Sequence, residues 1–203
     1  MLNTHDYESP RNQKFTKAAG NAKASEAVLL RDGTQVSIRP IRPDDASGLQ
    51  GLFNRLSQQS IFFRFLGIRK VLTDQEAKRL AEVDYQKQMA LVAISDQDGG
   101  VENIIAVARY DDLGPAEPET VEVAVVVEDQ YQDHGLGFHL LKKLAAYARP
   151  HNIHAFAALV HNENTRILRI IKQSELPVER KIFDHGVWEI RVNLRNMPEE
   201  LEG

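Results

Sequence analysis

The sequence predicts a single α/β domain with a mixed, mostly antiparallel sheet flanked by helices. The strand-like runs 89–94, 104–110 and 120–127 follow one another with turn-forming residues between them, which favours antiparallel neighbours. Beyond residue 127, helix-like and strand-like segments alternate, as they do in α/β proteins. The chain has 203 residues, of which 42% are apolar, and this is enough for one hydrophobic core.

The composition excludes several classes of protein. A net charge of −4 and an isoelectric point near 6.0 argue against nucleic acid as the main partner. There are no cysteines, so a disulfide, a thiolate metal site and a cysteine nucleophile are excluded. His151 and His154 have no evident third ligand, so we expect no metal. No apolar run approaches the ~18 residues that span a bilayer, and the first residues do not resemble a secretory signal. We therefore expect a soluble, cytoplasmic protein with no membrane partner.

The two ends differ in composition from the middle of the chain. Residues 1–26 are polar and carry few large apolar side chains, so they cannot bury enough surface to offset their ordering entropy. We expect a mobile tail there, which can also dock on a partner. Residues 196–203 are expected to be frayed. The folded domain is therefore expected to span residues 27–195, and its oligomeric state is left open.

The first half of the domain is predicted to contain one strand and two helices before the three strands. Residues 35–39 alternate between polar and apolar, as a half-buried strand does. Pro43, followed by two aspartates, resembles the start of a helix that runs to about Leu56. Thr73 and Glu76 form a capping box, in which a hydroxyl and a carboxylate each accept from an unpaired amide, and this begins the second helix.

The second half is predicted to alternate helix and strand. An apolar stripe with helical spacing begins at Gly137, and Pro150 ends it. The remaining predicted elements are a strand at 154–160, a helix at 164–173 and a closing hairpin of 178–183 and 187–192. The predicted order is βααβββαβαββ.

The loop before the helix at 137 carries the most specific signal for function. Its last residues are Gln132, Asp133, His134, Gly135, Leu136 and Gly137. The two glycines allow conformations and close approaches that a Cβ would hinder. The first amides of a helix lack internal partners and lie at the positive end of its dipole, which suits a phosphate or pyrophosphate. The alternative is an ordinary helix start whose glycines serve packing.

The spacing of the glycines discriminates between anions. A dinucleotide fingerprint needs a third glycine where Leu140 stands, and the Gly-Lys-Ser/Thr of a P-loop is absent. The spacing Gln-x-x-Gly-x-Gly instead resembles the cofactor motif of the GNAT acyltransferase superfamily. This resemblance implies a GNAT-like fold in which residues 132–137 grip the pyrophosphate of acetyl-CoA, the acyl donor.

The resemblance extends from about residue 30 to about residue 194. The segments 30–45, 56–65 and 84–93 are similar to the acetyltransferase domain of bacterial Pat-type protein lysine acetyltransferases. That domain often accompanies an acyl-CoA-synthetase-like or nucleotide-sensing region, and we expect a stand-alone version here. The resemblance implies an N-acetyltransferase whose acceptor is a protein lysine. The alternatives are a small-molecule amine as acceptor, or a non-catalytic acyl-CoA-binding sensor module.

Glu122 is the one acid inside the strand-like run 120–127. Alternate residues of a half-buried strand face solvent, and Glu122 can simply lie on that face. The functional interpretation is a general base. A lysine with a pKa of about 10.4 holds roughly one part in a few thousand of free amine at neutral pH, and a nearby carboxylate can take its proton. The matching glutamate of the Pat-like domains is the proposed base, which implies the same catalytic role for Glu122.

Further cofactor contacts follow from the same resemblance. Val125, Val126 and Val127 match positions whose backbone groups pair with the pantetheine arm, while their side chains also suit the core. Asn164 matches an asparagine near the cofactor, and it serves equally well as an N-cap. His134 can add positive charge beside the pyrophosphate or lie exposed in its loop.

The chain departs from the family pattern after residue 164. Many members place a tyrosine about two turns into this helix, where it protonates the departing thiolate. This sequence has Ile170 or Ile171 there, and the Pat-like branch is similar in using an apolar residue. The general acid is therefore unassigned, and Tyr131 and His161 are weak candidates.

Two groups of residues have plainer interpretations. Arg166, Arg169 and Lys172 are expected on a solvated helix face, from which they can also contact the ribose phosphate of the cofactor. Phe62 and Phe63 are expected in the core or in the wall of an acceptor groove, since nothing else in the chain indicates a nucleic-acid stacking platform.

Overall fold

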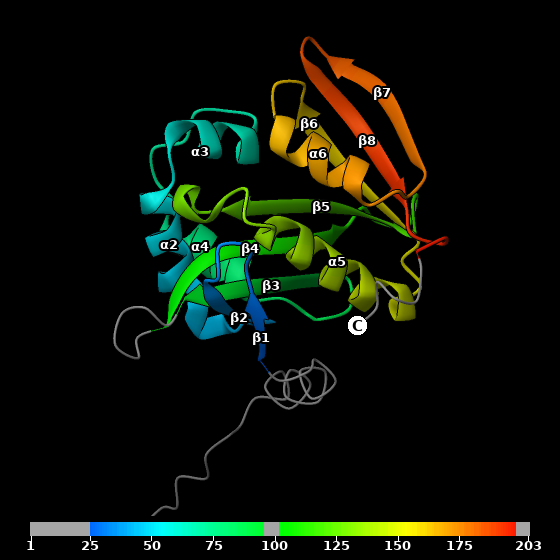
Figure 1. Cartoon of the computed structure of the whole chain (residues 1–203). Helices are drawn as coiled ribbons and strands as arrows, with labels where there is room; N and C mark the ends of the chain where they lie inside the picture. The colour runs from blue at the N-terminus through cyan, green and yellow to red at the C-terminus, as the bar shows by residue number, and fades with distance from the viewer. Residues whose placement is uncertain (1–24, 96–101, 198–203) are drawn as a thin grey trace, which may run out of the picture.

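The computed structural model of this chain describes residues 25–95 and 102–197, which form one eight-stranded sheet with flanking helices (Figure 1). The strand order is β1-β2-β3-β4-β5-β6-β8-β7, and each neighbouring pair is antiparallel except β5 with β6. This confirms the predicted mixed, mostly antiparallel sheet. The strands are β1 (Glu26–Leu29), β2 (Gln35–Pro40), β3 (Gln88–Ser95), β4 (Asn103–Asp112), β5 (Thr120–Val127), β6 (Ala155–His161), β7 (Val178–Asp184) and β8 (Val187–Asn193).

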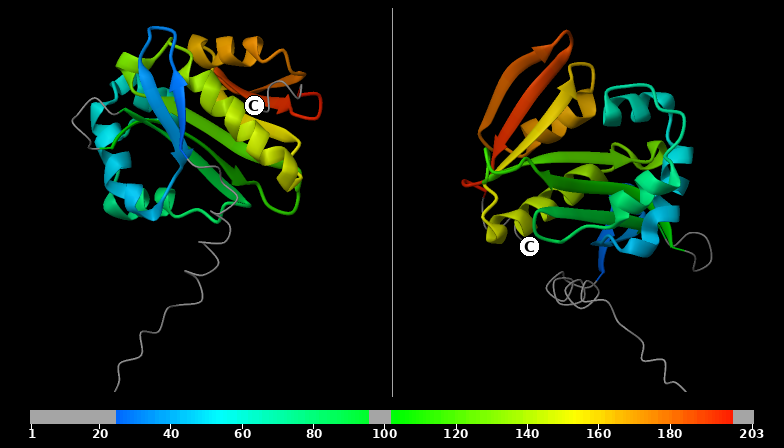
Figure 2. Two further views of the ribbon diagram at one scale, coloured as in Figure 1. Left: turned by 60° about the horizontal axis from the view of Figure 1, so that its bottom comes forward. Right: turned by 180° about the vertical axis from the view of Figure 1, so that it is seen from behind.

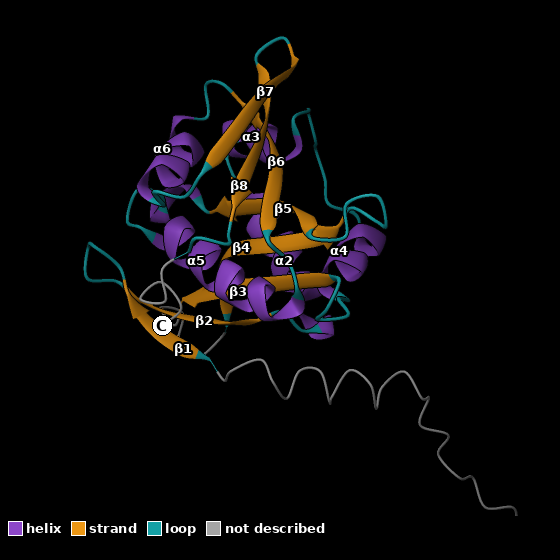
Figure 3. Ribbon diagram, turned by 90° about the vertical axis from the view of Figure 1, so that its right-hand side faces the viewer, coloured by secondary structure: helices purple, strands orange, loops and turns teal. Residues whose placement is uncertain are grey.

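Helices lie on both faces of the sheet. A Cβ placed on Gly137 of α5 would lie 3.7 Å from the Val127 side chain, so α5 packs on the face to which Val127 points. Arg109 pairs with Ala124, three residues from Val127, and therefore points to the opposite face, where it donates to the Leu80 carbonyl of α4. The helices are α2 (Ala46–Arg55), α3 (Gln58–Phe65), α4 (Asp74–Ala81), α5 (Leu136–Ala148) and α6 (Thr165–Gln173), with 3₁₀ turns η1 (Pro43–Asp45), η2 (Asp129–Tyr131) and η3 (Arg149–His151). Figure 2 shows α5 lying across the strands, and Figure 3 shows α6 beside β7 and β8.

The sequence does not predict two of these elements, β1 and α3. β1 is a short edge strand that begins at Glu26, inside the segment expected to be a tail. α3 has an N-cap at Ser57, whose hydroxyl accepts from the Ser60 amide, but its phenylalanines are poor helix formers and obscure the helical pattern. At the other end, Met197 is buried, although it falls in the segment expected to be frayed. Residues 1–24 of the expected tail, residues 96–101 with turn-forming residues between the runs 89–94 and 104–110, and the end beyond residue 197 lie outside the described residues.

The described residues form two hydrophobic cores of unequal size. The larger core is built by β1 to β5 with α2, α4 and α5. The smaller core consists of Val160, Ile171 and Ile190, which lie between β6, β8 and α6. The two parts meet at the parallel pairing of β5 with β6, which stops at Glu122 and Ala157. Beyond that point the two strands diverge, as Figure 1 shows.

Candidate active site

The diverging ends of β5 and β6 enclose a cavity of about 270 Å³. One wall is the end of β5, and the opposite wall is Ala158, Leu159 and Val160 of β6. On one side of the sheet the cavity is bounded by α5, α6 and the loop before α5. On the other side it is bounded by Phe63 and Arg64 of α3. The cavity therefore reaches both faces of the sheet through the gap between two strands.

The glycines of the loop have distinct structural roles. Gly135 has φ +94° and forms the N-cap of α5, a left-handed conformation that a side chain would strain. Gly137 allows α6 to approach, because a Cβ there would lie only 3.1 Å from Cδ1 of Ile170. Both glycines line the cavity. The absence of a Cβ at Gly137 thus leaves room where α5, α6 and β5 converge.

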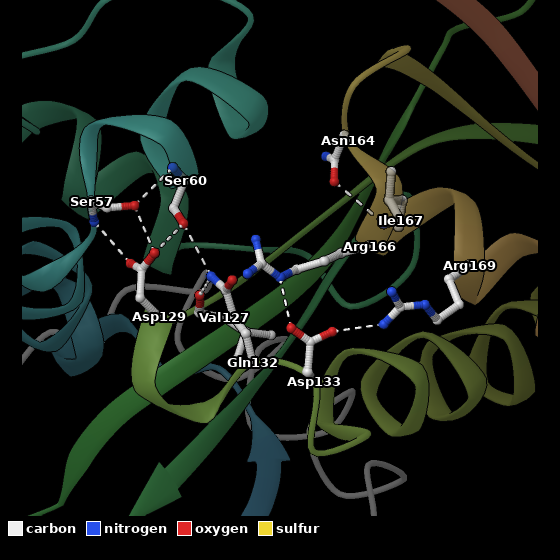
Figure 4. A network of polar contacts seen from close by, with 10 residues as sticks. All are labelled: Ser57, Ser60, Val127, Asp129, Gln132, Asp133, Asn164, Arg166, Ile167 and Arg169. Atoms are coloured by element: carbon white, nitrogen blue, oxygen red, sulfur yellow. Dashed lines mark hydrogen bonds and ion pairs between the residues drawn. The ribbon is translucent and has the colours of Figure 1, made fainter.

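Gln132 fastens the loop to its surroundings (Figure 4). Its amide nitrogen Nε2 donates to the Val127 carbonyl at 2.8 Å and to the Ser60 hydroxyl at 3.0 Å. Gln132 lines the cavity, but its amide protons are directed at β5 and α3. The side chain therefore holds the loop in shape, and the amide of Gln132 acts mainly on protein groups.

Asp129 joins α3 to the same loop. Its carboxylate accepts from the Ser57 amide at 2.8 Å, from the Ser57 hydroxyl at 2.6 Å and from the Ser60 hydroxyl at 2.8 Å. These hydrogen bonds lower the pKa of Asp129 although its partial burial opposes them. The network fixes the helix that presents Phe63 and Arg64 to the cavity.

Asp133 forms ion pairs with two arginines of α6. Its Oδ2 accepts from Arg166 Nε at 3.0 Å, and its Oδ1 accepts from Arg169 Nη1 at 2.9 Å (Figure 4). The Arg166 hydrogen bond is the largest cause of the lowered pKa of Asp133. All three residues line the cavity, so the arginines expected on a solvated helix face lie at the site itself.

Two of the residues predicted to bind the cofactor are turned away from the cavity. His134 pairs through Nδ1 with Asp32 at 3.4 Å, and its carbonyl accepts from the Arg31 amide. Leu136 is 1% exposed and belongs to the larger core. Neither side chain is among the residues that line the cavity. The backbone of both residues still forms part of the loop and of the first turn of α5.

Glu122 occupies the last paired position of β5, where the strands part. Its side chain is exposed. It points to the face opposite α5, because it lies an odd number of positions before Val127, which faces α5, and successive strand residues face opposite sides. Arg64 is half-buried nearby. Burial and the charge of Arg109 lower the pKa of Arg64 to about 10, while Glu122 and Asp111 act in the opposite direction. Glu122 thus lies in a group of alternating charges on the α3 side of the sheet.

The other predicted residues line the cavity. Val125, Val126 and Val127 form its β5 wall, and their side chains also pack on the larger core, so both interpretations made for them are compatible. Asn164 is the N-cap of α6, and its Oδ1 accepts from the Ile167 amide at 3.3 Å. Asn164 lines the cavity as well, so its capping role does not exclude a ligand contact.

The positions considered for a general acid differ in their surroundings. Ile170 and Ile171 both line the cavity. Tyr131 is 8% exposed, and its hydroxyl lies 3.5 Å from the Ser95 hydroxyl. The ring of His161 packs against the rings of Phe62 and Phe63, with centroids 5.3 Å and 6.0 Å apart.

Sequence analysis does not identify several of the residues that line the cavity. Arg31 comes from the turn between β1 and β2, and Ser60 and Arg64 come from α3. These segments are remote from the loop in sequence, so only the fold brings them to it. The hydrogen bond between the Arg31 amide and the His134 carbonyl is one such long-range contact. Serine is a favourable N-cap residue, so Ser57 is a signal for a helix start. A single serine does not suffice to predict α3.

Residues 25–95 and 102–197 meet neither the requirements of a metal site nor those of a membrane-spanning helix. Within these residues, no group of three or more His, Asp and Glu side chains is arranged to hold a metal ion. None of the helices in this part of the chain combines the length and apolarity that a membrane span requires.

Known proteins resemble this chain in sequence and in fold. A curated acetyltransferase of Pseudomonas aeruginosa is 37% identical over 120 residues, which are 59% of this chain and 63% of that relative. The chain therefore spans less than two thirds of that relative's length. The solved GNAT domain of S. lividans PAT is 29% identical, with a TM-score of 0.74, and the match covers 83% of this chain and 96% of that domain.

A more distant structure shares the fold. A protein of Salmonella typhimurium, solved with its cofactor acetyl-CoA, is 19% identical with a TM-score of 0.63, and the match covers 79% of this chain and 95% of that one. The model of the "Acetyltransferase (GNAT) family" matches residues 61–173, which is more than half of the chain. Family model, relatives and fold agree, and the chain belongs to the acetyltransferase (GNAT) family.

Proposed function

We propose that this chain transfers the acetyl group of acetyl-CoA to a primary amine, and that the amine is a lysine side chain of a protein. The observation that carries the proposal is the cavity between β5 and β6, which has a glycine-rich helix start on one side and Glu122 beside its other side. The family and the acetyl-CoA bound to the Salmonella relative support the donor. The acetyl thioester of this donor would supply the activated acyl group.

The residues around the cavity fit such a donor. The N-terminus of α5 offers unpaired amides and a positive dipole end to a pyrophosphate. Because Gly137 has no Cβ, the space beside Ile170 and Val127 stays free of a side chain from this position. The apolar wall of Val125 and Val126 suits a pantetheine arm, whose amides can pair with the strand backbone.

Glu122 is the proposed general base. An amine that enters on the α3 side would meet this exposed carboxylate where β5 and β6 part. Glu122 would accept the ammonium proton, directly or through a water, and the free amine would then attack the acyl carbon. The amide C–N bond forms, the thioester C–S bond breaks and coenzyme A leaves, with its thiolate taking up the proton that the nitrogen then loses. General-base catalysis of this kind contributes roughly 10²- to 10⁴-fold, and holding the two reactants together contributes more.

A protein lysine suits the geometry on this side. Glu122 is exposed, and the nearby Phe63 and Leu159 give apolar surface for the methylene stem of a lysine. The resemblance of segments 30–45, 56–65 and 84–93 to Pat-type protein lysine acetyltransferases supports this acceptor class.

Substitution of Glu122 tests the catalytic proposal. In Glu122→Gln, kcat for acetyl transfer to lysine peptides should fall by roughly 10²- to 10⁴-fold, because the amide cannot accept the proton. The Kd for acetyl-CoA, measured by titration calorimetry, should stay unchanged. At pH values below the pKa of the amine, the residual rate should rise about tenfold per pH unit, because the fraction of unprotonated amine rises by that factor.

A matched control is Glu179→Gln, which removes another exposed strand carboxylate, on β7. It should transfer acetyl groups at the wild-type rate. Wild-type turnover by Glu122→Gln would remove Glu122 as the base. A wild-type protein that binds acetyl-CoA and acetylates neither lysine peptides nor small amines would instead be an acyl-CoA-binding module.

A further inference from the structure

The loop that begins α5 contains an acid where an anion is expected to bind. Asp133 lies between Gln132 and the glycines, and it lines the same cavity. A carboxylate near a pyrophosphate is unfavourable because like charges repel. Its presence in the loop therefore needs a physical reason, and the backbone supplies only part of one. Asp133 has φ +63°, a conformation that aspartate and asparagine tolerate better than other residues.

The partners of Asp133 supply the rest. Its two oxygens hold Arg166 and Arg169, one arginine on each oxygen. Each arginine uses a single nitrogen in this contact, so the other guanidinium nitrogens can donate to an anion. Figure 4 shows Arg166 reaching from α6 towards the Asp133 carboxylate, and both residues line the cavity. A carboxylate bound to two guanidinium groups imitates the way in which phosphate oxygens bind arginine.

The ion pairs also cross the site. Asp133 belongs to the segment that leads into α5, whereas the arginines are on α6. The pairs are partly open to solvent, with side-chain exposures of 49% for Arg166 and 67% for Arg169. Exposed ion pairs are weak and exchange readily, so a dianionic ligand can compete for the same arginines.

We propose that Asp133 is an internal competitor for the phosphates of the acyl donor, occupying Arg166 and Arg169 until a donor phosphate takes its place. This inference rests on the proposed acetyl-CoA-dependent function. Asp133 then limits the affinity for the donor, and it favours ligands whose charge is sufficient to displace a carboxylate. It also neutralises one of the two positive charges when the donor is absent, so weaker anions are bound less.

The variant Asp133→Asn tests the idea directly. Asparagine keeps the size of the side chain and tolerates positive φ, so the loop should keep its shape. The expected result is a Kd for acetyl-CoA lower by roughly three- to tenfold, because both arginines become free and the net local charge rises by one. The Kd for S-acetylpantetheine, which has no phosphate, should not change. Titration calorimetry at several salt concentrations measures both, and the variant should show the steeper salt dependence.

Two further variants sharpen the test. Glu179→Gln changes the net charge equally on β7 and should leave the Kd for acetyl-CoA unchanged. Arg166→Gln should weaken acetyl-CoA binding, and in that background Asp133→Asn should give a smaller gain than in the wild type. The opposite result, unchanged or weaker binding of acetyl-CoA by Asp133→Asn, would mean that Asp133 positions the arginines and does not compete with the ligand.

Inorganic pyrophosphate separates this inference from the proposed function. If the wild type does not bind acetyl-CoA but Asp133→Asn binds pyrophosphate more tightly than wild type, the donor proposal fails and the competition stands. If acetyl-CoA binds and is transferred while Asp133→Asn gains no affinity for it, the inference fails and the function stands.

Discussion

Gly137 lies where three elements of the structure meet. It is the second residue of α5, it lies against Ile170 of α6, and it approaches Val127 of β5. Each contact comes from a different element, so the position can serve the fold and the cavity together. A side chain here would extend into the space where α5, α6 and β5 converge.

Gly137→Val should therefore weaken the binding of acetyl-CoA. The valine Cβ would lie 3.1 Å from Cδ1 of Ile170, and its methyl groups would extend further into the cavity. Overpacking of this kind costs ~1–3 kcal/mol, and here part of it would appear as lost affinity. Calorimetric titration with acetyl-CoA and thermal unfolding measure the two parts.

The control for this change is Gly67→Val, where the nearest atom to a new Cβ is the Phe65 carbonyl oxygen at 3.8 Å. It should bind acetyl-CoA as the wild type does. Wild-type affinity in Gly137→Val would show that Ile170 can move aside and that acetyl-CoA binding does not need a glycine at this position.

Single residues of the site could be predicted only as far as local pattern allows. The glycines and Gln132 follow from their spacing, because a helix start and its loop are adjacent in sequence. The direction of the Gln132 amide depends on Ser60, which is 72 residues away. The pairing of Asp133 with α6 likewise depends on the tertiary fold, and no local rule indicates it.

The helix starts show why some elements are easier to predict than others. The capping box of α4 is complete: the Thr73 hydroxyl and the Glu76 carboxylate each accept from the backbone amide of the other residue. Both residues are visible in the sequence, and α4 follows them. α3 depends on Ser57, and Ser57 is held by Asp129 from a distant turn. The start of α3 is thus fixed by tertiary contacts.

The cap of α4 should make stability depend on pH. Hydrogen bonds from the Thr73 amide and hydroxyl, aided by Arg69, lower the pKa of Glu76 from 4.5 to about 2. A lowered pKa in the folded state means that this contribution is complete above about pH 4.5 and is lost as the pH falls towards 2. The difference in unfolding free energy between wild type and Glu76→Gln, from urea titrations, should shrink over this interval. A difference that stays constant between these pH values would contradict the assignment.

The whole molecule consists of two unequal parts joined through β5 and β6. The alternating pattern of the strands and the order of elements predict the mixed sheet, because side-chain periodicity and turn residues are local signals. The divergence of β5 from β6 is not local. It follows from the way in which α6 and the β7–β8 hairpin pack on a small core of their own.

The smaller part should open more easily than the larger one. Its core contains three buried side chains, Val160, Ile171 and Ile190, and the strand pairing that joins it to the sheet is short. Amides of β6, β7 and β8 should therefore exchange with deuterium faster than those of β3 and β4, since local opening costs less where few apolar contacts are broken.

Acetyl-CoA should slow this exchange, because a ligand between β5 and β6 binds the closed arrangement. Hydrogen exchange followed by mass spectrometry, with and without acetyl-CoA, measures the effect. Equal protection of β6 and β3 in the free protein would show that the two parts unfold as one unit.

The cavity reaches both faces of the sheet, with α5 and α6 on one face and α3 on the other. The two sides are not independent, because the Ser60 hydroxyl of α3 donates to Asp129 and accepts from Gln132 of the loop before α5. A change in α3 that displaces Ser60 therefore also acts on the loop across the cavity. Redesign of one side of this cavity would have to keep Ser60 in place if the other side is to stay as it is.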